Sequence, residues 1–218
     1  MRELVCKLWM ESYIAHPFWP ETNTVINIQK QSGMNRAQSD AGRDKALKGH
    51  LQNLGLTMDN YDRLIALSKR QWYRTDNTNP KSSIVIPRHH LAGALVQTVN
   101  TTPASVKGKY KVDSFRASVR LSDFVTEKIE KDSVFGRFVK LEKSNQRSWQ
   151  ENESILEFEA IGTIEIADGE KTEGIERLFA WCLSEVGVGA ARKMGYGRGH
   201  VLSLRPATEA ETKAEAAT

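Results

Sequence analysis

The sequence EVGVGAARKMGYGRGHVLSL, residues 185–204, places five glycines and several basic side chains between two apolar runs. Glycine has no Cβ atom and tolerates positive φ, so its backbone can approach a ligand closely. Tyr196 offers a flat ring on which a base or ribose can stack. This combination favours a polyanionic ligand; the alternative is a turn that only reverses the chain. The candidate contacts are Arg192, Lys193, Gly195, Tyr196, Gly197 and Arg198.

Two common phosphate-binding motifs do not fit this segment. The dinucleotide fingerprint requires a strand directly before its glycines, and a P-loop requires Gly-Lys-Ser/Thr after them. Here a predicted helix over residues 174–186 precedes the glycines, and a predicted strand over residues 199–204 follows them. The glycine-rich segment therefore connects a helix to the last predicted strand.

Composition sets weaker limits on function. The 218 residues include 31 Lys and Arg against 27 Asp and Glu, for a net charge of +4, which is compatible with a nucleic-acid partner without establishing one. Cys6 and Cys182 each lie in an apolar run, which predicts buried, reduced thiols. We find neither a signal peptide nor a membrane span, so we expect a cytoplasmic protein with no membrane partner.

The hydrophobic pattern predicts core elements in the order strand, helix, strand, strand, helix, strand. The strands are expected over residues 2–14, 109–121, 154–166 and 199–204, and the helices over residues 88–99 and 174–186. This order is that of the ferredoxin-like βαββαβ fold of the α+β class, which RNA-recognition domains also use.

Two polar segments interrupt this pattern. Residues 15–83 form a large insertion after the first strand, with one short helix expected over residues 61–72. Residues 122–150 are mixed and basic, and Arg137 lies there between two phenylalanines. The first insertion carries glycines among its basic residues, as a flexible clamp that orders on RNA would, although a solvated face is the alternative. Its basic residues are Arg36, Arg43, Lys45 and Lys48.

Two segments together resemble the RAMP superfamily of CRISPR-associated proteins. Residues 187–204 are similar to its glycine-rich signature, in which a Gly pair, a basic stretch and Gly-aromatic-Gly-basic precede the last strand. Residues 86–95, IPRHHLAGAL, resemble the helix entrance Ile-Pro-Gly-Ser-Ser-Leu-Lys-Gly-Ala-Leu of its backbone subunits. Pro87, Leu91 and Gly93 keep their places in that pattern. The sequence departs from it at Arg88, His89, His90 and Ala92.

The resemblance implies one elaborated domain over residues 1–204, followed by a flexible tail over residues 205–218. A ferredoxin-like palm would comprise residues 1–14, 84–121 and 154–204, with an insertion at residues 15–83 and a thumb at residues 122–153. The implied function is a CRISPR RNA-binding backbone subunit that oligomerises along the guide RNA in an antiviral effector complex. Its partners would be guide RNA, target nucleic acid, further copies of itself and other effector subunits.

A protein that coats an RNA of varying sequence must hold phosphates and sugars rather than base edges. Arg88 and His89 begin a predicted helix, where free amides and the helix dipole favour a phosphate; the alternative is that both are solvated surface residues. With the residues named above, they complete the expected RNA-binding set: Arg36, Arg43, Lys45, Lys48, Arg88, His89, Arg137, Arg192, Lys193, Gly195, Tyr196, Gly197 and Arg198.

Catalysis, a metal site and a cofactor are not expected. Adjacent histidines on a helix point in different directions, so His89 and His90 make a poor metal site. Asp40 and Asp44 lie in the insertion where some backbone subunits of the superfamily carry a cleaving aspartate, but neither lies in a distinctive motif.

Two alternatives remain open. A guide-processing endoribonuclease of the same superfamily would use a histidine as general acid or base. The candidates for that role are His16, His50, His89 and His90. A non-CRISPR single-stranded RNA-binding module would need aromatic residues on its middle strands, and residues 154–166 offer only Phe158.

Overall fold

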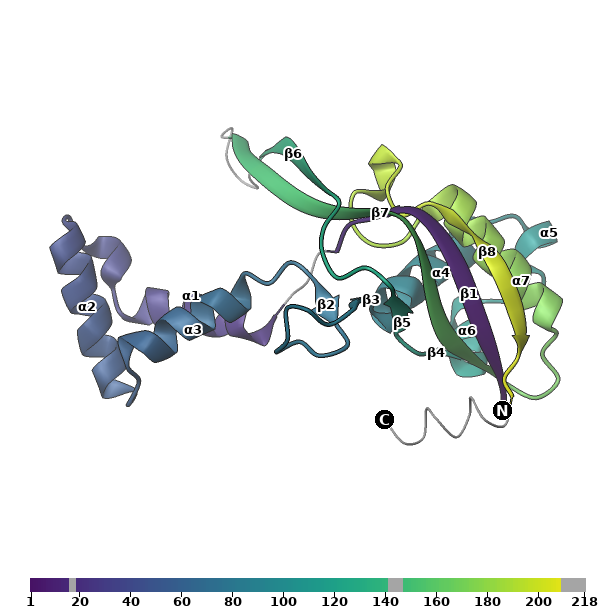
Figure 1. Ribbon diagram of the computed structural model, residues 1–218, viewed down its shortest axis with the longest axis horizontal. Coiled ribbons are helices and arrows are strands. Elements are labelled where there is room, and N and C mark those ends of the chain that lie inside the picture. The colour runs from purple at the N-terminus through teal and green to yellow at the C-terminus, as the bar shows by residue number, and fades with distance from the viewer. Residues whose placement is uncertain (16–18, 141–146, 209–218) are drawn as a thin grey trace. The chain divides into compact units, whose positions relative to one another are not determined.

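The computed structural model describes residues 1–15, 19–140 and 147–208 (Figure 1). Contacts divide the chain into two compact units. The larger comprises Met1–His16 and Trp72–Thr218, and the smaller comprises Pro17–Gln71. Mixed helices and an antiparallel sheet make this an α+β protein.

An antiparallel sheet with the strand order β2-β3-β5-β7-β1-β8 forms the larger unit, and β4 also pairs with β7. The central neighbours are β1 (Arg2–Tyr13) and β7 (Arg147–Ile166), and β8 (Gly199–Pro206) pairs with the other side of β1. The remaining strands are β2 (Tyr73–Arg74), β3 (Ile84–Ile86), β4 (Val119–Leu121), β5 (Phe124–Thr126) and β6 (Ser133–Lys140).

One face of this sheet is buried and the other is open. Along β1, Leu4, Cys6, Leu8 and Met10 are fully buried, whereas the side chains that alternate with them lie on the opposite face. Helices α4 (Arg88–Thr101) and α7 (Thr172–Trp181) pack against the buried face (Figure 1). Each large aliphatic side chain buried there contributes about 1.5–3 kcal/mol.

Both cysteines lie in this core as free thiols, as the sequence predicted. Burial raises the pKa of Cys6 to about 12, with a further contribution from the charge of Glu176. Burial also raises the pKa of Cys182 to about 11. Both thiols therefore stay protonated at neutral pH.

The strand expected over residues 109–121 is wrong for most of its length. Helix α6 (Val112–Ser118) occupies this segment, after the short helix α5 (Ala104–Lys107), and only the following three residues form β4. The hydroxyl of Ser114 accepts a hydrogen bond from the Lys111 amide at 3.0 Å, which caps the first turn of α6. Phe115 is buried on this helix, so one apolar anchor outweighs the imperfect alternation around it.

The other core helices and strands follow the predicted pattern with longer or altered ends. Helix α7 continues into a π-helical turn, Cys182–Val186, and ends at Gly187 with φ 78°. Strand β7 begins before its predicted start, because its first half pairs with β6 in a hairpin. Strand β8 extends to Pro206, two residues beyond the predicted end.

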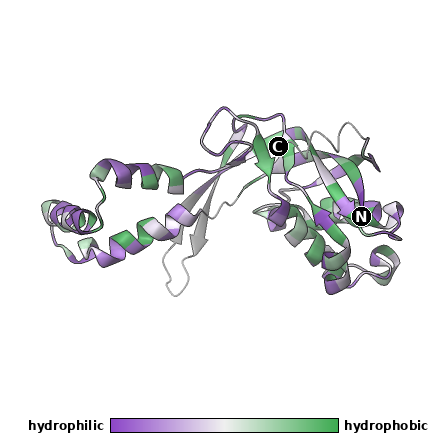
Figure 2. Cartoon of the chain, turned by 90° about the horizontal axis from the view of Figure 1, so that it is seen from below, coloured by the Kyte–Doolittle hydropathy of each residue, from purple (hydrophilic) through white to green (hydrophobic). Residues whose placement is uncertain are grey.

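In the smaller unit, the described residues form three α-helices around a core of their own. These are α1 (Pro20–Gln31), α2 (Asp40–Asn53) and α3 (Met58–Ser68), with a 3-10 turn at Met34–Arg36. Hydrophilic and hydrophobic residues both occur along these helices (Figure 2). The core residues are Val25, Ile28, Leu47, Leu51 and Tyr61.

The sequence predicted only one of these three helices. Their apolar residues are few and widely spaced. Side-chain caps mark the start of two of them: Ser39 accepts from the Gly42 amide at 3.1 Å before α2, and Thr57 accepts from the Asn60 amide at 3.2 Å before α3. Gly42 and Gly49 lie inside α2. These two glycines therefore lie within a helix and not in a loop, and the expected clamp on RNA stays a prediction.

Candidate nucleic-acid interface

The glycine-rich loop, residues 187–198, is held against the end of β1 by backbone hydrogen bonds. The amide of Ala190 donates to the carbonyl of Ile14 at 2.9 Å, and the amide of Gly197 donates to the carbonyl of Ser12 at 3.1 Å. Within the loop, the amide of Val188 donates to the carbonyl of Gly197 at 2.9 Å. These bonds fix the loop as part of the sheet's end.

Close packing explains two of the glycines. A Cβ atom at Gly197 would lie 1.9 Å from the carbonyl oxygen of Val188, and one at Gly189 would lie 2.6 Å from that of Ile14. Gly197 is also buried, and its amide already donates to Ser12. The absence of a side chain at Gly197 therefore lets the loop close on Val188, and not RNA approach the backbone as expected. We remove Gly197 from the expected RNA-binding set.

Gly195 differs from Gly197. It is exposed, it has φ 92°, and a Cβ atom there would meet no heavy atom within 4 Å. The backbone at this position is therefore open to a ligand. Next to it, Lys193 is exposed and Arg192 is half-buried.

An aromatic pair lies beside these cations. The ring of Tyr196 packs on Phe135 of β6, with centroids 5.4 Å apart and planes tilted by 46°. Both residues are only partly buried, so their rings offer a surface on which bases could stack. The sequence singled out Tyr196 but could not show that the hairpin of β6 and β7 brings Phe135 to it.

Arg198 has a structural contact of its own. Its guanidinium donates to the carbonyl of Ser184 at 2.5 Å, at the end of the π-helical turn. Cations that bond the last carbonyls of a helix stabilise its end. Arg198 is half-buried, so it can contribute charge to the surface while holding this turn.

Tyr13 joins the glycine-rich loop to the start of α4. Its hydroxyl is hydrogen-bonded to Nδ1 of His90 at 2.7 Å, and its ring lies against Gly189, where an added Cβ atom would be 2.6 Å away. Burial, with smaller contributions from Tyr73 and Asp123, raises the pKa of Tyr13 well above its usual value. The two segments singled out by sequence therefore meet at one buried phenol.

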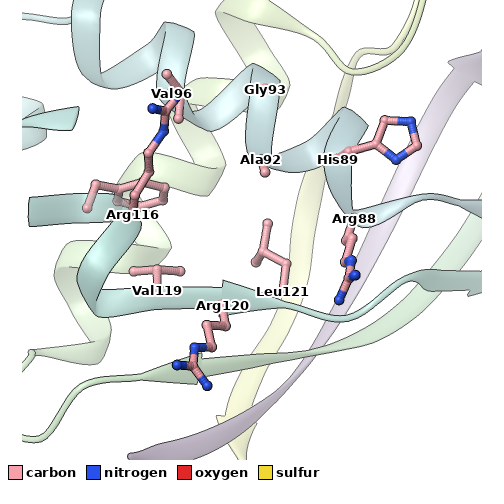
Figure 3. A pocket seen from close by; sticks show the side chains of 10 residues that line it. Arg88, His89, Ala92, Gly93, Val96, Arg116, Val119, Arg120 and Leu121 are labelled. Carbon is pink, nitrogen blue, oxygen red and sulfur yellow. The ribbon is translucent and has the colours of Figure 1, made fainter. Parts of the chain in front are cut away.

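The start of α4 corrects one expectation. The amide of Arg88 donates to a carboxylate oxygen of Asp123 at 2.7 Å, so an acidic side chain already caps the helix where we expected a phosphate. The side chains of Arg88 and His89 remain exposed and line a cavity between α4, α6 and β4 (Figure 3). Arg116 and Arg120 line the same cavity; neither was expected there, because residues 109–121 were predicted to form a strand.

The expected RNA-binding residues of the smaller unit are exposed on α2 and the 3-10 turn. Lys45 and Lys48 are three residues apart and share one side of α2. Arg43 forms an ion pair with Asp40 at 3.2 Å, which assigns this aspartate a local partner. Arg36 lies in the 3-10 turn. The exposed side chains of Arg36, Lys45 and Lys48 are available for a polyanion.

Some expected residues fall outside the description. Arg137 belongs to β6, but its side chain is not among the described parts, and His16 lies wholly outside them. Within the described ranges, no group of three or more His, Cys, Asp or Glu side chains could hold a metal ion. The same part of the chain contains no helix that is long and apolar enough to cross a membrane.

Comparisons with known proteins found similarity at the level of solved structures. No family model matches the chain, and no curated protein matches its sequence. The cryo-EM structure of the Type III-B Cmr-beta bound to cognate target RNA includes a similar chain, 10% identical, with a TM-score of 0.49. That match covers 94% of this chain, which spans 60% of the other's length. Cmr6 from Pyrococcus furiosus is 10% identical with a TM-score of 0.33, over 91% of this chain and 97% of that one.

Proposed function

We propose that this chain is a CRISPR RNA-binding backbone subunit that oligomerises along a guide RNA in an effector complex. The observation that carries the proposal is the contact of both motifs with Tyr13. The glycine-rich loop and the entrance of α4 are the segments that resemble the RAMP superfamily, and they pack on the same side chain. The other proposed partners are target nucleic acid and further effector subunits.

The strand order supports a ferredoxin-like palm. Strands β8, β1, β7 and β4 are neighbours in that order, and the chain reaches them as first β1, then α4, β4, β7, α7 and β8. This is the connectivity of a split βαβ arrangement. In this proposal the smaller unit, Pro17–Gln71, lies within the insertion at residues 15–83, and the hairpin of β6 and β7 provides the thumb at residues 122–153.

The proposed contacts hold the RNA backbone and stack on its bases without reading them. Lys193 and Arg192 would neutralise phosphates, and the backbone at Gly195 would approach the strand. Tyr196 and Phe135 would stack on bases whatever their identity, because every base has a π face. The further residues proposed for this role are Arg36, Arg43, Lys45, Lys48, Arg88, His89, Arg137 and Arg198.

Binding of single-stranded RNA at several salt concentrations tests this function. Fluorescence anisotropy with labelled RNAs of unrelated sequence should give similar affinities that fall steeply as salt rises, because each neutralised phosphate releases counterions. An affinity that is indifferent to salt, or confined to one sequence, would contradict the proposal.

We also predict that the chain does not cut its bound guide. Nδ1 of His90 is hydrogen-bonded to buried Tyr13, and the exposed His89 packs edge-on against the rings of Tyr73 and His90, with centroids 5.4 Å and 4.6 Å away. A labelled repeat RNA incubated with the protein should stay intact. Specific cutting that disappears in folded His89→Ala or His90→Ala variants would instead favour the guide-processing endoribonuclease.

A further inference from the structure

The cavity beside α4 combines an apolar floor with a cationic rim. It has a volume of about 540 Å³ and lies within the larger unit (Figure 3). Its floor comes from three elements: Ala92 and Val96 of α4, Phe115 of α6, and Val119 and Leu121 of β4. None of these side chains carries a hydrogen-bond donor or acceptor. The floor can therefore cover a flat apolar surface but cannot read a pattern of polar atoms.

Three arginines surround this floor. Figure 3 shows the side chains of Arg88, Arg116 and Arg120 on different sides of the apolar residues. Arg120 has a long ion pair with Glu165, 3.8 Å between the charged atoms. Among the described residues, the guanidinium groups of Arg88 and Arg116 have neither a hydrogen bond nor an ion pair, and both residues are exposed. The rim thus offers positive charge that the described protein leaves mostly uncompensated.

We propose that this cavity holds one unpaired nucleotide of the bound RNA, with the base on the apolar floor and the phosphates on the arginines. The inference rests on the proposed function and extends it to a defined site. A guanidinium group is planar, pairs with phosphate through two parallel hydrogen bonds and stacks on aromatic rings. The cavity volume lies within the range of about 300–1,000 Å³ that is usual for small-ligand sites. Because the side chains of its floor carry no hydrogen-bonding groups, the site would accept any base.

The positive charge of the rim favours a nucleotide over the purely apolar ligands that such a floor could bind. A hydrocarbon chain would give the three guanidinium groups no anionic ligand. A free phosphate would leave the apolar floor uncovered. An aromatic or acidic segment of a protein also combines the two properties, so the experiment below includes it as an outcome.

Gly93 provides a way to fill the cavity without disturbing the fold. It lies in α4, lines the cavity and is exposed, and a Cβ atom added there would meet no heavy atom within 4 Å. A Gly93→Phe side chain would therefore project into the cavity. Gly93→Ala is the matched control, because it makes the same backbone change without filling the space.

Two labelled chains of equal length separate base binding from phosphate binding. One is an ordinary single-stranded RNA, and the other carries the same phosphates with abasic sites in place of bases. The wild type and Gly93→Ala should prefer the RNA by about fivefold or more, since stacking one base contributes about 1–3 kcal/mol. Gly93→Phe should lose part of this preference while its affinity for the abasic chain is unchanged. Arg116→Ala should weaken the binding of both chains. Arg177→Ala removes an exposed arginine of α7 outside the cavity and should weaken the binding of both chains less.

Saturation-transfer NMR with AMP tests the site even if the protein does not bind RNA chains. The base protons of AMP should receive magnetisation from the wild type and Gly93→Ala, but much less from Gly93→Phe. A protein that fails to bind RNA but passes this test would refute the proposed function and leave the nucleotide site standing. The proposed site would be overturned if Gly93→Phe bound the RNA, the abasic chain and AMP each as well as the wild type does. So would a change in self-association of Gly93→Phe without RNA, because the cavity would then receive a protein segment.

Discussion

At the scale of single residues, Gly195 and Gly197 share a positive φ but differ in their surroundings. Gly197 faces the backbone of Val188, whereas Gly195 faces open space. Gly197→Ala should therefore destabilise the fold by more than about 2 kcal/mol, since the loop backbone must move. Gly195→Ala should cost only about 1 kcal/mol, from the strained φ alone. Urea unfolding of the two variants measures the difference, and equal losses would contradict this account of the loop.

The bond between Tyr13 and His90 is a second residue-scale test. His90→Ala removes a partner from a fully buried hydroxyl, which should lower the free energy of unfolding by about 1–3 kcal/mol. Adding Tyr13→Phe removes the stranded hydroxyl, so the double variant should lose less than the sum of the single losses. His89→Ala, at an exposed neighbour, should change stability by less than about 0.5 kcal/mol. Additive losses in this cycle would show that the bond contributes nothing.

At the scale of elements, Asp132 ties the segment before β6 to β7. Burial raises the pKa of Asp132, but the hydrogen bond from the Leu156 amide and the charge of Lys128 outweigh it, and the net pKa lies below its usual value. A carboxyl pKa that is lower in the folded state contributes stability above its unfolded pKa of about 4. This contribution is lost as the pH falls through the folded value.

Asp132→Asn should therefore lower Tm near neutral pH and remove part of the acid-induced loss of stability. Thermal unfolding of the variant and the wild type between neutral pH and about pH 2 measures this effect. Glu127→Gln, an exposed carboxylate of the same segment, is the control and should leave the profile almost unchanged. A variant whose Tm falls with acid as steeply as that of the wild type would contradict this role for Asp132.

Some elements were predictable because their signal is local. Alternation along β1 and the inner half of β7 reflects one buried face, and the periodicity of α7 reflects its packing on the sheet. The outer half of β7 was not predictable in this way, because it pairs only with β6. Helix α6 depends on one buried anchor, Phe115, and the smaller unit depends on a core of widely spaced residues. The structure of these segments depends on long-range contacts, which a local sequence pattern does not show.

The candidate site was predictable in its parts but not in its assembly. The sequence identified both motifs, and the structure adds that Tyr13 connects them. It also assigns the Arg88 amide to Asp123 and the Gly197 amide to Ser12, two contacts that no local pattern signals. Arg116 and Arg120 became candidates only because α6 and β4 place them beside α4.

At the scale of the whole molecule, the central claim is that copies of this chain assemble along RNA. Light scattering coupled to size-exclusion chromatography, with RNAs of increasing length, tests it most directly. The mass of bound protein should rise in steps of one 24.5 kDa chain as the RNA lengthens. Arg192→Ala/Lys193→Ala should shorten these assemblies at moderate salt, whereas Arg177→Ala should affect them less. One chain per RNA whatever its length, or assembly that the loop variant leaves unchanged, would contradict the account.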